Sequence, residues 1–189
     1  MDDVIKKLTA EQALEVLTRL SAKGGKIREA VLTQARNVLS DIDLDATADE
    51  VFFLLDSIDV QDCWDRSGSS RNGYTSPDEA AVEIIEETLQ PFSGQVERYC
   101  ELGMHEQEMT YCRAVILGLY RYAHESESEF KAWSVDIAVE CAGDLLHEWR
   151  ERCRTVSSGA MSEFIQQRCP KWARYLIRKN NKTRRSLRE

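Results

Sequence analysis

The fold is decided by residues 104–125, MHEQEMTYCRAVILGLYRYAHE, which carry apolar side chains on nearly every face of a helix. A helix that is apolar almost all round is normally buried inside its domain. Ala114 and Gly118 lie four residues apart, and their small size lets another backbone approach one face of this helix. A mid-helix glycine nevertheless costs about 1 kcal/mol relative to alanine. We therefore predict that 104–125 is the central helix of an all-helical domain.

Composition supports one folded domain. The chain has 189 residues, of which 42% are apolar and 31% charged, and this is enough to bury a core. The net charge of -8 is unevenly distributed along the chain: residues 171–189 are basic, with eight basic side chains and one acidic one. We predict a single helical domain over 1–170 and a basic C-terminal helix and tail over 171–189. Neither a membrane span nor a signal peptide is indicated, so we expect a cytoplasmic protein.

The first two helices are marked by their ends. Thr9 and Gln12 form a capping box ahead of an apolar stripe, and Gly24-Gly25 follows that stripe. A second helix is expected over about 26–39, and the two should form an antiparallel hairpin. A third helix should begin near residue 48, with Asp45 or Thr47 as its N-cap and Thr47 and Glu50 as a capping box.

The next segments alternate between helix and loop. Ser57 and Asp59 indicate a helix break and a new N-cap, and residues 66–73 form the longest segment predicted to lack regular structure. Ser76-Pro77-Asp78-Glu79 is the strongest local signal in the chain, with an N-cap serine, proline at the first helical position and glutamate closing the box. Its apolar positions continue past Pro91, which predicts one kinked helix or two nearly collinear ones ending at Leu102-Gly103.

After the central helix, Ser126 and Glu129 predict a capping box for a short turn. A long amphipathic helix is expected over about 135–153, then a brief helix ended by Pro170 and a last helix with Trp172, Tyr175 and Leu176. No strand pattern and no strict repeat period are present. The predicted fold class is therefore all-α, with antiparallel helical hairpins stacked as an irregular α–α superhelix or a helical bundle.

The side chains that carry chemistry form no recognised motif. The segment that begins at His147 lacks the second histidine of HExxH, and the six cysteines contain no CxxC, so a structural zinc site is not expected. Buried reduced thiols are the favoured state of these cysteines. Aspartate occupies every second position of residues 41–45, as it does at the start of an EF-hand calcium-binding loop. The rest of the loop does not fit, because Ala46 and Phe52 occupy the positions that need glycine and glutamate. We expect no catalytic residue, no metal and no cofactor.

Six segments resemble the helical region of bacterial proteins that carry a SWIM-type zinc finger. They are LTAEQALEVL (8–17), REAVL (28–32), EVFFLLDSIDVQDCWDRSG (50–68), GYTSPDEAAVEIIEETLQPF (73–92), RYCELGM (98–104) and ILGLYRY (116–122). The resemblance implies an α-helical, repeat-like domain that contacts proteins or nucleic acid. The SWIM motif itself, Cys-x-Cys followed by Cys-x-His, has no match in the chain, so the resemblance supplies no zinc ligands.

These observations favour a non-catalytic helical module or scaffold that binds a protein partner. The alternative is a nucleic-acid-associated accessory or regulatory protein that binds phosphates through its tail, with Trp172 and Tyr175 available to stack on bases. A basic tail can also pair with an acidic surface of its own fold or of a partner. The candidate tail residues are Lys171, Arg174, Arg178, Lys179, Lys182, Arg184, Arg185 and Arg188.

A second candidate contact surface is the loop region between residues 59 and 74. Trp64 and Tyr74 would be its aromatic anchors, although core packing of Trp64 is the favoured interpretation because tryptophan buries a large area when it can. The candidate residues are Asp59, Asp62, Trp64, Asp65, Arg66 and Tyr74.

Overall fold

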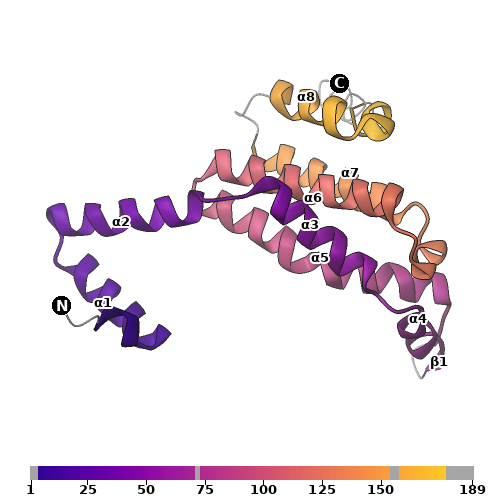
Figure 1. The fold of residues 1–189 in the computed structure, drawn as a ribbon, viewed down its shortest axis with the longest axis horizontal. Helices are drawn as coiled ribbons and strands as arrows, with labels where there is room; N and C mark the ends of the chain where they lie inside the picture. The colour runs from indigo at the N-terminus through magenta and orange to yellow at the C-terminus, as the bar shows by residue number, and fades with distance from the viewer. Residues whose placement is uncertain (1–3, 71–72, 154–157, 178–189) are drawn as a thin grey trace. The chain divides into compact units, whose positions relative to one another are not determined.

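The structure is a computed structural model that describes residues 4–70, 73–153 and 158–177 (Figure 1). The all-α prediction is confirmed, because helices make up nearly all of its regular structure. The chain divides into two compact units, residues 1–41 and residues 42–189. The single domain predicted over 1–170 stays a prediction, and the two units are described separately here.

The first unit contains the short 3-10 helix η1 (Ile5–Lys7) and the helices α1 (Ala10–Ala22) and α2 (Gly25–Ser40). The predicted capping box is present, since the Thr9 hydroxyl accepts from the Gln12 N–H and the Gln12 side chain accepts from the Thr9 N–H. Gly24 has a φ of 69°, a left-handed conformation that glycine adopts without strain. Glycine at this position therefore ends one helix and starts the next.

The second unit is built around α6 (His105–Glu125), as predicted. It packs against α3 (Leu44–Asp56), α5 (Pro77–Glu101), α7 (Ile137–Arg152) and α8 (Ser158–Arg168), and Figure 1 shows α3, α5 and α7 running beside it. Two shorter elements connect these helices, α4 (Val60–Arg66) and the 3-10 helix η2 (Glu129–Trp133), and a helix over residues 170–177 follows α8.

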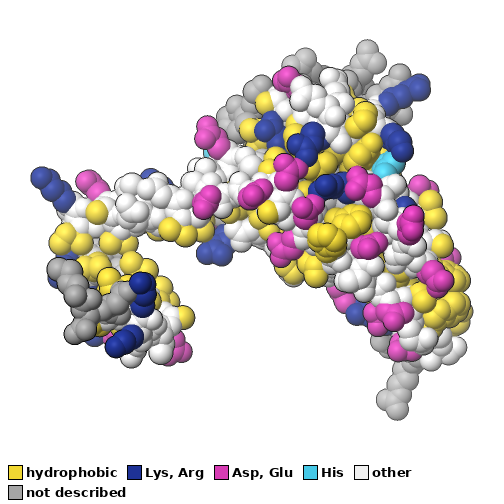
Figure 2. Space-filling model, in the orientation of Figure 1, with side chains coloured by type: hydrophobic (Ala, Val, Ile, Leu, Met, Phe, Trp, Pro, Cys, Tyr) yellow, Lys and Arg dark blue, Asp and Glu magenta, His cyan; other side chains and the backbone are white. Residues whose placement is uncertain are grey.

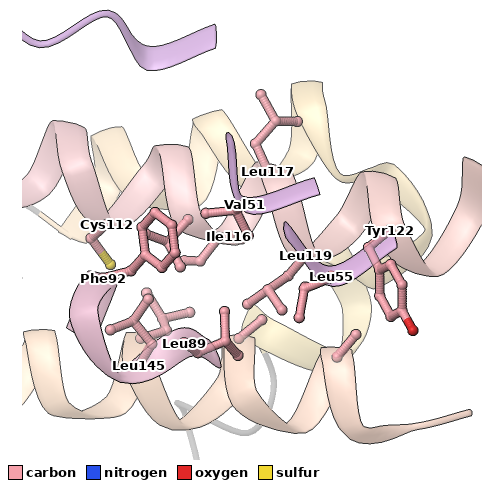
Figure 3. Close-up of a cluster of buried hydrophobic side chains, with 14 of the residues drawn as sticks. Val51, Leu55, Leu89, Phe92, Cys112, Ile116, Leu117, Leu119, Tyr122 and Leu145 are labelled. Atoms are coloured by element: carbon pink, nitrogen blue, oxygen red, sulfur yellow. The ribbon is translucent and has the colours of Figure 1, made fainter. Parts of the chain in front are cut away.

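The core of this unit gathers around the apolar stretch of α6. Cys112, Ile116, Leu119 and Tyr122 are buried there, and Figure 3 shows them facing side chains from α3, α5 and α7. Those neighbours include Val51, Leu55, Leu89, Phe92 and Leu145. Burial of such side chains stabilises a fold by roughly 1.5–3 kcal/mol each, so this cluster accounts for most of the driving force of the second unit.

The backbones of α6 and α3 lie close together at Gly118. A Cβ placed on it would lie 2.6 Å from the Ala48 carbonyl oxygen and 2.6 Å from the Val51 Cβ. Neither atom belongs to the free end of a flexible side chain, so no substituent fits without a backbone shift. The predicted close approach is therefore confirmed at Gly118, with α3 as the approaching helix.

Three local predictions are wrong. Asp43, not Asp45 or Thr47, caps α3, because its carboxylate accepts from the Ala46 N–H at 3.0 Å. The segment predicted to lack regular structure contains the short strand β1 (Gly68–Ser70), which pairs antiparallel with β2 (Gly73–Thr75) so that Gly68 lies opposite Thr75. Ser126 forms no capping box with Glu129, and its hydroxyl instead donates to Asp56 Oδ1 at 2.6 Å.

The capping box of α5 supports a first prediction. Ser76→Ala should lower the free energy of unfolding in urea by about 1 kcal/mol, because the Glu79 N–H loses its acceptor at 3.2 Å. Ser93→Ala in the middle of the same helix is the matched control and should be nearly neutral, since the Ser93 hydroxyl only shares carbonyls of the helix. Equal losses in the two variants would show that the cap is not responsible.

The same box has a pH dependence with a defined sign. The backbone N–H of Ser76, and then its hydroxyl, donate to Glu79 and lower the pKa of that carboxyl below its ordinary value of 4.5. A lowered pKa stabilises the fold above the ordinary value and stops doing so as the pH falls through the lowered one. The effect of Ser76→Ala should therefore shrink in acid.

Candidate functional site

The α1–α2 hairpin exposes an apolar surface. No described residue of either helix is buried, and Leu14 and Val38 are 66% and 75% exposed. Figure 2 shows hydrophobic side chains along both helices. We call this set of exposed side chains the apolar hairpin surface: Leu14, Val16, Leu17, Ile27, Leu32 and Val38. Because two short helices here expose six large apolar side chains and bury none, this surface is a candidate for contact with a partner.

Basic side chains outnumber acidic ones over residues 4–40, although Asp2, Asp3 and Asp41 bring the whole first unit close to neutral, and residues 42–170 are acidic. Residues 4–40 carry three acidic side chains, Glu11, Glu15 and Glu29, and one ion pair between Arg19 and Glu15 is formed within α1. The basic side chains outnumber them and are Lys6, Lys7, Arg19, Lys23, Lys26, Arg28 and Arg36. A surface that is apolar and basic suits a partner that is apolar and acidic.

The predicted loop surface lies on α4 and the β1–β2 pair. Asp59 caps α4, and Asp62, Asp65 and Arg66 are exposed, with Arg66 paired to Glu87 of α5 at 2.7 Å. Asp62 carries no role that the structure reveals beyond its place in the first turn of α4. Tyr74 on β2 is 67% exposed.

The favoured interpretation of Trp64 as a core residue is wrong. Its side chain is 46% exposed and packs edge-on against Trp133 of η2, with ring centroids 5.0 Å apart. The core position beside it belongs to Cys63, which is fully buried. Cys63 and Trp64 are adjacent in the sequence, but they lie on different faces of α4, and only the face of Cys63 packs against α5.

The basic C-terminal segment is described only at its start. Lys171 and Arg174 are exposed on the helix over residues 170–177, whereas Arg178, Lys179, Lys182, Arg184, Arg185 and Arg188 lie outside the described residues. Trp172 is buried, with its ring 5.2 Å from Tyr120 and 5.8 Å from His124 of α6. The expectation that Trp172 stacks on nucleic-acid bases is therefore wrong, since its ring fixes this helix to the body.

A polar cluster lies where α5, α6 and α7 meet. Glu108 of α6 is fully buried, and its Oε2 accepts from the Cys153 thiol at 2.8 Å and lies 3.2 Å from Nδ1 of His105. Cys100 completes the group, because ligand atoms of Cys100, His105 and Glu108 all lie within 4.8 Å of one another. We call Cys100, His105, Glu108 and Cys153 the Glu108 cluster.

The turn between α5 and α6 positions this cluster. Gly103 has a φ of 66°, its N–H donates to the Cys100 carbonyl at 2.9 Å, and the Met104 N–H donates to the Tyr99 carbonyl at 2.9 Å. This pair of bonds is a Schellman motif, which ends one helix and turns the chain into the next. The Leu102-Gly103 signal therefore predicted the helix end, but not that the turn brings a thiol, an imidazole and a carboxylate together.

Burial governs the chemistry of the thiols. All six cysteines are free, and desolvation raises the pKa of Cys141 to about 11 and the pKa of Cys153 to about 12. Hydrogen bonding to Glu108 adds to the effect at Cys153. The pKa of the fully buried Cys112 rises still further. A thiol needs its thiolate form to act as a nucleophile, so these positions are poorly suited to nucleophilic catalysis.

The raised pKa of Cys141 gives a second prediction. Alkylation by iodoacetamide should be slow at neutral pH and should still rise about tenfold per pH unit near pH 10, whereas free cysteine levels off about two units lower. Peptide mass spectrometry after timed labelling measures the rate at this single thiol, and the urea-unfolded chain is the control. A plateau near pH 9 in the folded protein would contradict the prediction.

Cys141 also lines a cleft of ≈ 290 Å³ between α5, α6 and α7. The floor is apolar, with Leu89, Val115 and Leu145, and Glu86 and Glu148 lie at the rim. Its volume is at the lower end of the range for small-molecule sites, and the thiol that lines it is held mainly in the protonated form by desolvation. We assign no ligand to it.

Comparison of the chain with protein-family models, with curated proteins and with solved structures finds no match. The resemblance to the helical region of SWIM-type zinc finger proteins therefore stays a prediction. None of the described helices combines the length and the apolar character needed to cross a membrane.

Proposed function

We propose that this protein is a non-catalytic helical interaction module or scaffold and that the α1–α2 hairpin supplies its contact surface. The observation that carries the proposal is the absence of any buried residue in the described part of this hairpin, despite the apolar stripe on each helix. Isolated helices of 13 and 16 residues are marginal in water. Such a pair gains most of its stability from whatever covers its apolar side.

The energetic argument favours a partner of matching chemistry. Covering a leucine or valine stabilises a complex by roughly 1.5–3 kcal/mol at full burial, so the apolar hairpin surface can contribute several kilocalories per mole. The basic side chains around it would steer an acidic partner and make its association salt-dependent. An amphipathic acidic helix satisfies both conditions.

The nucleic-acid alternative rests on the basic tail. Lys171 and Arg174 are exposed, which supports a role in phosphate contact, but the burial of Trp172 removes one of the two proposed stacking residues. Tyr175 is 42% exposed. This alternative makes a different prediction, because binding through the tail would not depend on Leu14 or Leu17.

A pull-down with paired variants separates the two functions. The full chain and the variant Leu14→Glu/Leu17→Glu are compared in lysate with and without nuclease, at low and moderate salt. The control is Thr33→Glu/Asn37→Glu, which adds the same charge at exposed positions on the polar side of α2. We expect nuclease-resistant capture of one protein by the native chain and the control, and its loss in the leucine variant.

Two results would contradict the proposal. Capture that survives in the leucine variant but disappears with nuclease would favour the nucleic-acid alternative. A large fall in melting temperature confined to the leucine variant, with no partner found for the native chain, would show that the apolar hairpin surface stabilises the protein's own fold.

A further inference from the structure

The Glu108 cluster has the composition of a transition-metal site. A thiol from Cys100, an imidazole from His105 and a carboxylate from Glu108 converge within 4.8 Å, and the Cys153 thiol lies 3.6 Å from His105 Nδ1. Donors around tetrahedral zinc lie roughly 3–4 Å apart, given metal–ligand distances of about 2.0–2.3 Å. Thiol and imidazole donors favour zinc and related ions over calcium or magnesium, which prefer oxygen ligands.

Glu108 provides an independent indication of a ligand. Its side chain is fully buried, and its Oε1 accepts no hydrogen bond from any described residue. The nearest cation is Arg152, whose Nε lies 3.5 Å from Oε1 without a hydrogen bond between them. A buried carboxylate oxygen without a hydrogen bond is costly, and the ion pair with Arg152 at 3.5 Å offsets that cost only in part. The other oxygen, Oε2, faces His105 and Cys153, so the carboxylate can accept a further positive charge from a metal ion on that side.

The charges of the site balance with a divalent ion in place. Two thiolates and one carboxylate carry three negative charges, and the ion with Arg152 carries three positive ones, while the imidazole stays neutral. Binding replaces the two thiol protons, which leave to solvent, so the net charge of the cluster is unchanged. Balanced charge matters here because Glu108 and Cys153 are buried.

We propose that Cys100, His105, Glu108 and Cys153 bind a zinc-type divalent cation that ties the α5–α6 turn to the end of α7. The His105 side chain is 45% exposed, so the ion has a path from solvent. Cys100, His105 and Glu108 already lie within 4.8 Å of one another, and a shift of the Cys153 side chain would supply the fourth donor. With four protein donors bound the site is structural, because no position stays open for a substrate. This proposal does not depend on the partner-binding function, because the two use different residues.

Titration of the full chain tests this site. After treatment with a chelator, Co²⁺ is added while thiolate-to-cobalt charge transfer in the near ultraviolet and the visible bands of tetrahedral cobalt are recorded. Zn²⁺ is then used to displace it. We expect saturation at one ion per chain, both spectral signatures, and a higher melting temperature with the ion bound.

Matched variants link the signal to these residues. Cys100→Ser and His105→Gln each remove a donor at a partly exposed position and should weaken Co²⁺ binding by roughly tenfold or more. Cys141→Ser and His147→Gln replace a thiol and an imidazole of similar exposure outside the cluster and should bind as the native chain does. Far-ultraviolet circular dichroism checks that each variant is folded.

Either of two outcomes would overturn the proposal. One is the lack of saturable binding with a charge-transfer band. The other is equal affinity in the folded cluster variants and their controls, which would assign the uptake to other groups on this acidic protein. In both cases Glu108 would be held by Cys153, His105 and Arg152 alone.

Discussion

Gly118→Ala should destabilise the second unit by about 1–3 kcal/mol, even though alanine is the better helix former. The added methyl group would meet the Ala48 carbonyl oxygen and the Val51 Cβ at 2.6 Å, so α3 and α6 would have to move apart. Urea unfolding followed by circular dichroism gives the change in free energy. The cost comes from overpacking, so Gly118→Val should cost more than Gly118→Ala.

Gly94→Ala is the matched control for this prediction. Gly94 lies inside α5, is exposed, and a Cβ added there meets nothing within 4 Å. The substitution should stabilise the protein by roughly 0.5–1 kcal/mol through helix propensity alone. Stabilisation by both substitutions would contradict the close contact between α3 and α6.

Trp149→Ala should cost about 3–5 kcal/mol, the largest effect of a single substitution proposed here. Trp149 is 1% exposed on α7 and is the largest fully buried side chain in the described part of the chain. The expected loss is a large fraction of the free energy of folding of a typical domain, so the variant should show a sharply lower melting temperature or fail to fold. Differential scanning calorimetry measures it.

Two further tryptophan variants keep this prediction testable. Trp149→Phe retains most of the ring volume and removes an indole N–H for which no described group is an acceptor, so it should cost much less than the alanine variant. Trp64→Ala removes a half-exposed ring and should cost about 1 kcal/mol, the value of its contact with Trp133. Similar losses at positions 64 and 149 would contradict the burial described here.

Much of the fold follows from local signals in the sequence. The boxes at Thr9 and Ser76 mark helix starts, Gly103 marks a helix end, and the apolar run in residues 104–125 marks the central helix, because each of these signals acts within one or two turns. The β1–β2 pair was missed because its strands have three residues each, too few to show an alternating pattern.

Features that depend on tertiary structure could not be predicted in this way. The apolar stripe on α1 has the spacing of a buried helix, yet nothing within its own unit buries it. Periodicity in the sequence identifies an apolar face of a helix, but it does not show which element packs against that face. Three members of the Glu108 cluster, Cys100, His105 and Glu108, are close in the sequence, but their spacing matches no standard ligand motif. The fourth, Cys153, is 45 residues from Glu108, and only the packing of α7 against α6 brings it to the cluster.

Hydrogen exchange of the free full-length chain tests the central claim most directly. At concentrations low enough to exclude self-association, backbone amides of α1 and α2 should exchange orders of magnitude faster than those of α6, because little apolar contact stabilises the hairpin. Addition of the captured partner should slow exchange in α1 and α2. Protection of α1 and α2 in the free chain equal to that of α6 would contradict the account, since it would mean that the apolar hairpin surface is already covered.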